Sequence, residues 1–155
     1  HSVAQGELSL PLQVQLAQQP LRDSGDEFVR FKTTRRQHYD AFAPSAADIF
    51  DTLLWNERGE LTEFTRGNVF LKLGQRWLTP ALSSGLLDGI ARAQILKEGL
   101  PAAAGADAGL SAQEAVIPRS ELTLASQLVF VNSCRGWLPA QMHEAAGPLD
   151  PAVST

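Results

Sequence analysis

The chain has few cysteines, few charges and no long apolar run. Cys134 is its only cysteine, so no disulfide can form within the chain, and we expect this residue to be small and buried. Acidic residues outnumber Lys and Arg by 17 to 13, and the formal net charge of -4 argues against a nucleic-acid surface. No apolar run approaches the ~20 residues that a membrane-spanning helix needs. We therefore expect a cytoplasmic protein with no nucleic-acid or membrane partner.

Metal chemistry also lacks support in the sequence. The three histidines, His1, His38 and His143, show no spacing typical of a metal site, so we assign no metal ligand. The first residue is His1 rather than Met, so we expect either a processed chain or a piece of something longer.

The remaining composition, 155 residues of which 44% are apolar, suits one ordinary globular domain. Alternating or continuous apolar runs predict nine strands, at 8–17, 28–33, 49–55, 60–64, 68–73, 76–79, 114–118, 128–132 and 137–140. Three short helices are expected, at 35–42, from Asp88 or Gly89 to about Lys97, and at 120–127. The predicted class is α+β with a mostly antiparallel sheet.

Three local features refine this prediction. Pro11 removes a backbone donor, so the first strand should be an edge strand or carry a bulge. The four strands between residues 49 and 79 should form one antiparallel meander. The connector at 100–112 is rich in Pro, Ala and Gly and should be mobile.

The stretch over 61–96, LTEFTRGNVFLKLGQRWLTPALSSGLLDGIARAQIL, combines a carboxylate near its start with a helix opening near its end. Glu63 is the carboxylate, and Gly89 stands at the helix start. A carboxylate and an amide-rich helix start are what a phosphorylated, nitrogen-containing ring needs at its two ends. The pattern also permits plainer interpretations, with Glu63 exposed on a strand and Asp88 capping the helix amides.

Four phrases occur in this order: FKTTRRQHYD, FDTLLWNERGELTEFTRGNVF, LTPALSSGLLDGIAR and LVFVNSCRGWLP. Together they resemble the C-terminal half of the class IV pyridoxal-phosphate enzymes, which include branched-chain aminotransferases, D-amino-acid aminotransferases and aminodeoxychorismate lyases. The likeness is greatest to the lyase-like domain fused to component I of aminodeoxychorismate synthase. It implies a barrel-like, cofactor-binding C-terminal domain over 1–142 and a flexible tail over 143–155. The family's N-terminal domain is expected to be absent from this chain.

The resemblance implies roles toward pyridoxal 5'-phosphate for individual residues. Lys32 matches the catalytic lysine that bonds to the cofactor, although a lysine in a basic run is ordinarily solvated. Glu63 matches the glutamate that pairs with the pyridine nitrogen and makes the ring an electron sink. Asn68 matches an asparagine that supports the site, and a plain turn residue remains equally possible.

The other implied cofactor contacts lie near the helix start. Leu87 matches a residue that packs on the ring, and it also fits a plain core position. Residues matching the phosphate-binding positions are Gly89, Ile90, Ala91 and Ser133. Ala91 departs from the threonine of aminotransferase relatives, so a hydroxyl contact is lost.

The resemblance implies a lyase that converts 4-amino-4-deoxychorismate into 4-aminobenzoate and pyruvate in folate precursor synthesis. Lys32 would act as general base. A class IV aminotransferase, or a non-catalytic domain of this fold, remains an alternative. As half an enzyme, the isolated chain should be inactive. Its expected partners are a small-molecule substrate, the missing N-terminal domain or synthase subunit, and further copies of itself.

Overall fold

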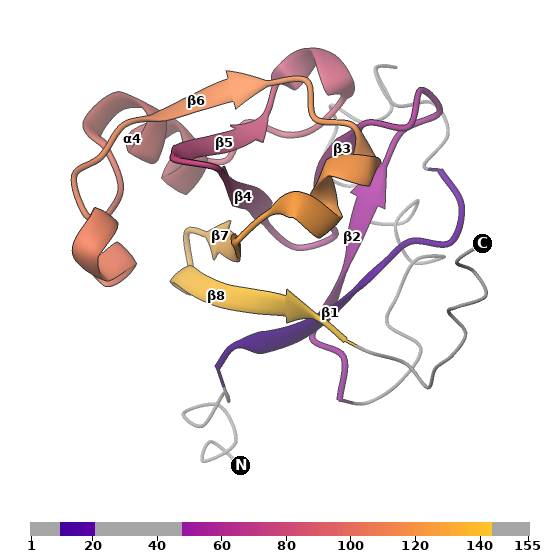
Figure 1. The fold of residues 1–155 in the computed structure, drawn as a ribbon, viewed down its shortest axis with the longest axis horizontal. Coiled ribbons are helices and arrows are strands. Elements are labelled where there is room, and N and C mark those ends of the chain that lie inside the picture. The colour runs from indigo at the N-terminus through magenta and orange to yellow at the C-terminus, as the bar shows by residue number, and fades with distance from the viewer. Residues whose placement is uncertain (1–9, 21–47, 144–155) are drawn as a thin grey trace.

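The computed structural model of the chain describes residues 10–20 and 48–143 (Figure 1). Several predicted features lie outside these two ranges: the strand over 28–33, the helix over 35–42, Lys32 and the tail from 144 to 155. The statements that follow concern the two described ranges.

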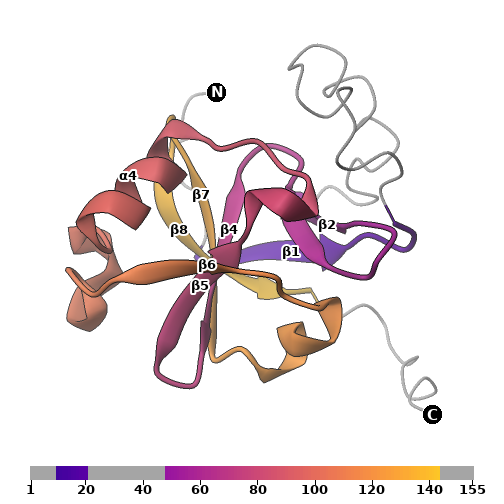
Figure 2. The ribbon, with the colours of Figure 1, turned by 90° about the horizontal axis from the view of Figure 1, so that it is seen from above.

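One sheet of eight strands organises these residues, in the spatial order β3-β2-β1-β8-β7-β4-β5-β6. The strands are β1 Leu12–Leu16, β2 Asp51–Trp55, β3 Leu61–Phe64, β4 Asn68–Leu73, β5 Arg76–Pro80, β6 Ala112–Ala115, β7 Gln127–Asn132 and β8 Gly136–Met142. The helical elements are α4 Ile90–Glu98 and three 3-10 segments, η2 Leu82–Ser84, η3 Ala102–Asp107 and η4 Arg119–Leu124. Figure 2 shows the sheet curving into a half-barrel with α4 outside it, which confirms the predicted barrel-like α+β fold with few helices.

The sheet is mixed, and the first strand does not lie where the sequence suggested. β1 runs parallel to both of its neighbours, β2 and β8, and so lies inside the sheet. The prediction of an edge or bulged strand from Pro11 is therefore wrong. Leu12, paired with Ala140, is the first residue of β1 in the ladder, so Pro11 stands before it and its missing N–H removes no ladder bond.

The predicted four-stranded meander is also wrong, because it consists of two separate hairpins. β2 pairs with β3, and β4 pairs with β5, but the other edge of β4 pairs with β7. Residues 65–67 form the corner between the hairpins, where the Phe64 N–H donates to the Gly67 carbonyl at 2.8 Å. A Cβ on Gly67 would lie 2.7 Å from the Val131 carbonyl oxygen, so a residue without a side chain lets this corner pack on β7. Glu63 and Asn68 lie on either side of the corner.

The observed helices agree only in part with those predicted from the sequence. α4 begins after Gly89 and ends at Glu98, and Gly99 follows it with a positive φ of 99°, which glycine adopts more readily than other residues. The helix expected over 120–127 is instead the 3-10 segment η4, which ends at Leu124. The connector expected to be mobile contains η3, and Asp107 ties it to the sheet by accepting hydrogen bonds from Lys72 Nζ at 2.8 Å and Trp77 Nε1 at 2.9 Å.

Two apolar clusters lie on opposite faces of the sheet. Successive strand side chains point to opposite faces, so Leu71 and Phe130 join one cluster while Phe70 and Val129 join the other. Ile95 of α4 belongs to the second cluster, which packs the helix against the outer face of the sheet. Burying each such side chain contributes about 2 kcal/mol, so this packing holds α4 against the sheet.

Candidate functional site

Glu63 is buried at the end of the β2–β3 hairpin, with 1% of its surface exposed. Its Oε1 accepts a hydrogen bond from the backbone N–H of Leu87 at 3.3 Å. The interpretation of Glu63 as an exposed strand residue is therefore wrong. A buried carboxylate is costly unless polar groups compensate it, and the Leu87 amide is one group that does so.

Asn68 begins β4 and is also buried, with 5% of its surface exposed. Its Nδ2 donates to the carbonyl oxygen of Leu87 at 3.0 Å. The N–H of Leu87 is bound by Glu63 and its C=O by Asn68, so two strands hold one residue of the loop that leads into α4. We call this arrangement the Leu87 clasp.

Gly89 follows the clasp and precedes the first residue of α4. Its φ of -64° is open to any residue, so its glycine is required by space rather than by backbone conformation. A Cβ built on Gly89 would lie 2.6 Å from Asn68 Oδ1. The helix start thus lies directly against the side chain that holds Leu87.

The start of α4 carries no side-chain cap. The first amides of a helix have no partner within the helix, and together with the helix dipole they favour an anion. Ile90 is 77% exposed and Ala91 is half-buried, so part of this helix start is open to solvent. This geometry fits a phosphate-binding helix start better than an ordinary capped one.

Asp88 was the expected competitor for these amides, and that interpretation is wrong. Its Oδ1 accepts from Arg92 Nη1 at 2.7 Å, one helical turn further along. Arg92 is 1% exposed and also contacts Glu114 and the Pro80 carbonyl. The sequence analysis did not single out Arg92, although its i,i+4 spacing from Asp88 is a signal for an ion pair.

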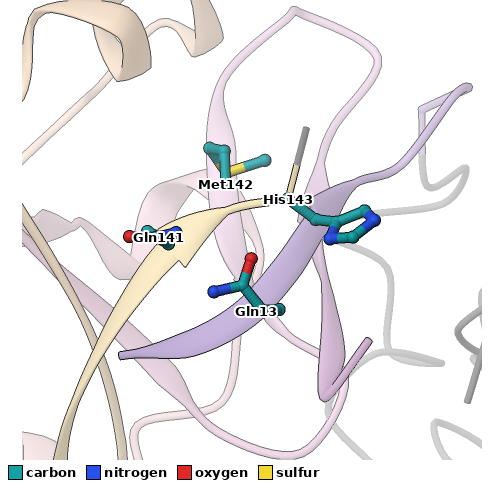
Figure 3. A pocket seen from close by; sticks show the side chains of 4 residues that line it. All are labelled: Gln13, Gln141, Met142 and His143. Carbon is teal, nitrogen blue, oxygen red and sulfur yellow. The ribbon is translucent and has the colours of Figure 1, made fainter. Parts of the chain in front are cut away.

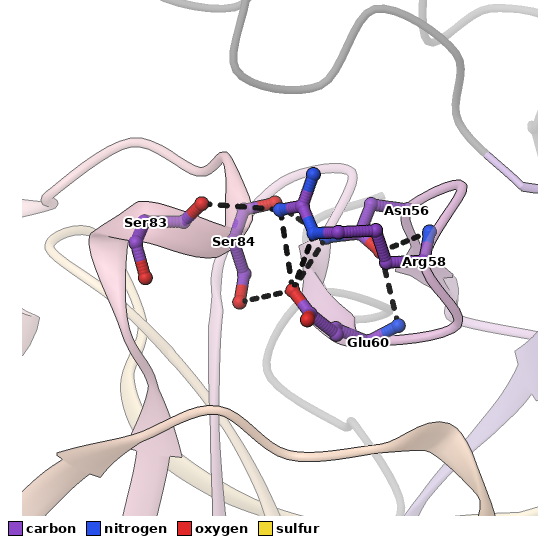
Figure 4. Close-up of polar contacts among 5 residues, drawn as sticks. All are labelled: Asn56, Arg58, Glu60, Ser83 and Ser84. Carbon is purple, nitrogen blue, oxygen red and sulfur yellow. Dashed lines mark hydrogen bonds and ion pairs between the residues drawn. The ribbon is translucent and has the colours of Figure 1, made fainter.

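The loop that carries Leu87 is fixed upstream as well (Figure 4). Asn56 Nδ2 donates to the Ser84 carbonyl at 2.9 Å, and Ser84 Oγ donates to Glu60 Oε1 at 3.0 Å. Arg58 adds a bond to the Ser83 carbonyl at 3.2 Å. Hydrogen bonds hold the pKa of Glu60 below its ordinary value. The bond from the Asn56 amide contributes most, and those from Arg58 and Ser84 add to it. The β2–β3 turn therefore anchors the start of the loop, and the Leu87 clasp anchors its end.

Ser133 lies in a different place, in the turn between β7 and β8, and it is exposed. Asn132 shapes this turn by donating to the Arg66 carbonyl at 2.9 Å and accepting from the Arg135 N–H at 2.7 Å. Within residues 10–20 and 48–143, no hydrogen bond joins Ser133 to the Leu87 clasp. Cys134 is exposed in the same turn, so the expectation of a buried cysteine is wrong.

An open hollow of about 600 Å³ lies beside β1 and the end of β8, away from the Leu87 clasp (Figure 3). Its described lining residues are Gln13, Gln141, Met142 and His143. Gln13 and Gln141 are register partners, so they project from neighbouring strands toward the same face. The two Gln amides and the His143 imidazole can form hydrogen bonds, but these four residues include neither a carboxylate nor a lysine, and we assign them no cofactor site.

Of the eight residues predicted for the site, four are brought into one cluster: Glu63, Asn68, Leu87 and Gly89. Ile90 and Ala91 continue directly from it as the first turn of α4. Ser133 is not joined to the cluster, and Lys32 lies outside the described ranges. The cluster offers a buried carboxylate and an uncapped helix start, tied together through one loop.

In the described ranges, no helix has the length and apolar character needed to cross a membrane. Nor does this part of the chain contain a group of three or more His, Cys, Asp or Glu residues able to hold a metal ion.

Comparison with known families and proteins identifies relatives of this chain. The sequence model of the family described as amino-transferase class IV matches residues 3–142. Over 49 residues the chain is 43% identical to a Schizosaccharomyces pombe protein named as a candidate aminodeoxychorismate lyase, covering 32% of this chain and 21% of that protein. Over 50 residues it is 40% identical to a Thermotoga maritima protein named as a candidate branched-chain-amino-acid aminotransferase, covering 32% of this chain and 18% of that protein.

A solved structure extends the likeness along the chain. It is a candidate amino-acid aminotransferase from Mesorhizobium loti, 35% identical, with a TM-score of 0.69. The match covers 84% of this chain and 58% of that one. The chain thus spans little more than half the length of this relative.

Proposed function

Because the chain belongs to the class IV aminotransferase family, whose cofactor is pyridoxal 5'-phosphate, we propose that it forms the cofactor-binding part of a 4-amino-4-deoxychorismate lyase. Its reaction would release 4-aminobenzoate and pyruvate, a step that supplies a folate precursor. Support for the lyase comes from the sequence resemblance and from the S. pombe relative's name.

The described residues fit this cofactor. Glu63 would pair with the protonated nitrogen of the ring, and the backbone amides at Gly89, Ile90 and Ala91 would hold the phosphate. When bound, the cofactor supplies an electron-withdrawing ring that stabilises negative charge on the neighbouring substrate carbon. The close contact between Gly89 and Asn68 supports this fit. Since a Cβ on residue 89 would collide with Asn68 Oδ1, no side chain occupies the N-cap position of α4.

Other residues would complete the site and carry the proton transfer. Lys32 would bond to the cofactor and then take a proton from the substrate carbon as general base. Leu87 would pack against the ring, and Ser133 would add a hydroxyl at the phosphate. The partners in this proposal are the substrate, an N-terminal domain or synthase subunit, and a second copy of the chain.

The observation that carries the proposal is the Leu87 clasp. It links the buried carboxylate of Glu63 to the start of α4 through a single loop residue held at both its N–H and its C=O. Fixed spacing between a carboxylate and an anion-binding helix start is what a rigid, phosphorylated heterocycle requires.

An aminotransferase is the second candidate. The M. loti structure and the T. maritima protein, at 35% and 40% identity, are both named as candidate aminotransferases. The two activities share the cofactor and differ in whether pyruvate is eliminated or an amino group is transferred.

A direct assay separates the two. The full-length protein that carries this sequence is loaded with pyridoxal 5'-phosphate and supplied either with 4-amino-4-deoxychorismate or with amino acids and a 2-oxo acid. Release of pyruvate and 4-aminobenzoate supports the lyase, and amino transfer supports the alternative. Glu63→Gln should lower the rate by at least about a hundredfold, whereas Glu98→Gln, an exposed change on α4, should not. Cofactor binding without either reaction would contradict both assignments.

A further inference from the structure

Arg92 is buried between carboxylates from two different elements. Its Nη1 donates to Asp88 at 2.7 Å, and its Nη2 donates to the Pro80 carbonyl at 3.0 Å and contacts Glu114. The side chain of Arg92 is 1% exposed, whereas the side chains of Asp88 and Glu114 are 47% and 42% exposed.

Stability alone is a poor explanation for this arrangement. Taking a guanidinium out of water is costly, and a buried ion pair often stabilises a fold less than apolar residues of similar volume. Arg92 Nε has no hydrogen-bond partner, so the desolvation of this side chain is only partly compensated. Arg92 is also the third residue of α4, where the helix dipole disfavours a cation.

The same features are favourable if an anion binds at the helix start. In the first turn, Arg92 offsets the negative charge of Asp88, which lies beside the exposed amides. Asp88 directly precedes the N-cap residue Gly89, and a carboxylate there would compete for those amides and repel an anion. Its ion pair with Arg92 directs this carboxylate away from the amides, and the helix start has no side-chain cap.

We propose that Arg92 is a positioning residue that binds Asp88 and thereby keeps the start of α4 available to the phosphate of the cofactor. The inference rests on the proposed function, because it takes α4 as the phosphate site. It adds a role for two residues, Arg92 and Asp88, that do not themselves touch the cofactor. In the competing account, Arg92 only anchors α4 to β5 and β6 through Pro80 and Glu114.

Four variants of the full-length chain separate the accounts: Arg92→Gln, Asp88→Asn, the double variant, and Glu114→Gln as matched control. The control weakens the same ion network without freeing Asp88. Binding of pyridoxal 5'-phosphate and of pyridoxal, which lacks the phosphate, is measured by absorbance titration, with circular dichroism as the check on folding. The ratio of the two affinities reports on the phosphate site alone.

The inference predicts that Arg92→Gln lowers the affinity for pyridoxal 5'-phosphate about tenfold more than that for pyridoxal. Adding Asp88→Asn should restore most of the loss, and Glu114→Gln should leave the ratio unchanged. Equal loss for both ligands, or no recovery in the double variant, would overturn it.

The single variant Asp88→Asn keeps the test decisive if Arg92→Gln fails to fold. It should bind pyridoxal 5'-phosphate as tightly as the parent chain or more tightly, and selective weakening would refute the inference. If the parent chain binds pyridoxal 5'-phosphate and pyridoxal with equal affinity, the phosphate site and the proposed function fail together. A parent that prefers pyridoxal 5'-phosphate, combined with an unchanged ratio in Arg92→Gln, removes only the role of Arg92.

Discussion

Asn68 Nδ2 donates a hydrogen bond to the carbonyl oxygen of Leu87, 19 residues away in sequence, at 3.0 Å. The N–H of Leu87 is bound in turn by Glu63. A strand corner and a helix-entry loop therefore meet at one residue, Leu87.

Replacing Asn68 with Ala should destabilise the fold and weaken cofactor binding together. The partly buried Leu87 carbonyl would lose its partner, which costs about 1 kcal/mol or more of unfolding free energy. Urea unfolding and titration with pyridoxal 5'-phosphate measure the two effects. Thr79→Val is the matched control, because it removes a buried bond from Thr79 Oγ1 to the Val69 carbonyl, outside the clasp. An equal loss of cofactor affinity in both variants would count against a special role for Asn68.

Gly89→Ala should be destabilising by about 1–3 kcal/mol, because the added methyl would collide with Asn68 Oδ1. The cost should depend on Asn68. In the background Asn68→Ala the colliding oxygen is gone, so the same change should cost less, and the two substitutions should not be additive. Denaturant unfolding of the four members of this double-mutant cycle provides the coupling energy. Additive effects would show that the crowding arises elsewhere.

These contacts explain which parts of the site the sequence could predict. Glu63, Asn68, Leu87 and Gly89 were each identified from residue type and family resemblance, and the structure brings the four residues together. The sequence could not predict that Leu87 links Glu63 to Asn68, because this link depends on how the two hairpins are arranged. The sequence predicted one meander, but the close packing of Gly67 on β7 separates the hairpins.

Glu60→Gln should reduce stability near neutral pH, with an effect that disappears in acid. Hydrogen bonds from Asn56 first, and then from Arg58 and Ser84, lower the pKa of Glu60 below its ordinary 4.5. The charged form is therefore favoured by folding, and its contribution is complete above pH 4.5 and lost as the pH falls through the folded pKa. The difference in unfolding free energy between parent and variant should narrow from pH 7 to pH 3. A gap that does not change with pH would indicate a purely steric effect.

Asp107→Asn should loosen the connector between α4 and β6. Bonds from Lys72 and then from Trp77 hold the pKa of Asp107 below its ordinary value, so the carboxylate stays charged at neutral pH. Without that charge, η3 should detach more often, and limited proteolysis should cut within Ala102–Asp107 several times faster. Gln113→Ala, which removes only an exposed contact with Arg76, should leave the cutting rate unchanged. Equal rates in the parent chain and Asp107→Asn would mean that the connector does not depend on this carboxylate.

The connector also shows the limit of composition as a guide. A segment rich in Ala, Gly and Pro predicts mobility, and composition does not reveal its anchors: Asp107 accepts from two sheet residues, and backbone bonds join Leu100 to Gly109 and Leu110. Pro11 misled in a similar way, because a proline that precedes the first ladder residue does not exclude a central strand. Most strand positions and the position of α4 follow from local pattern, whereas sheet order and loop anchoring depend on contacts between residues far apart in sequence.

The most direct test of the account is to find where pyridoxal 5'-phosphate attaches. The chain has three lysines: Lys32, Lys72 and Lys97. Lys72 is paired with Asp107, and Lys97 is exposed on the last turn of α4. After incubation of the full-length protein, borohydride reduction and peptide mapping, the account predicts one saturable adduct on Lys32 and a reduced yield in Glu63→Gln. No adduct on a folded chain, or labelling of Lys97 as strong as that of Lys32, would contradict it.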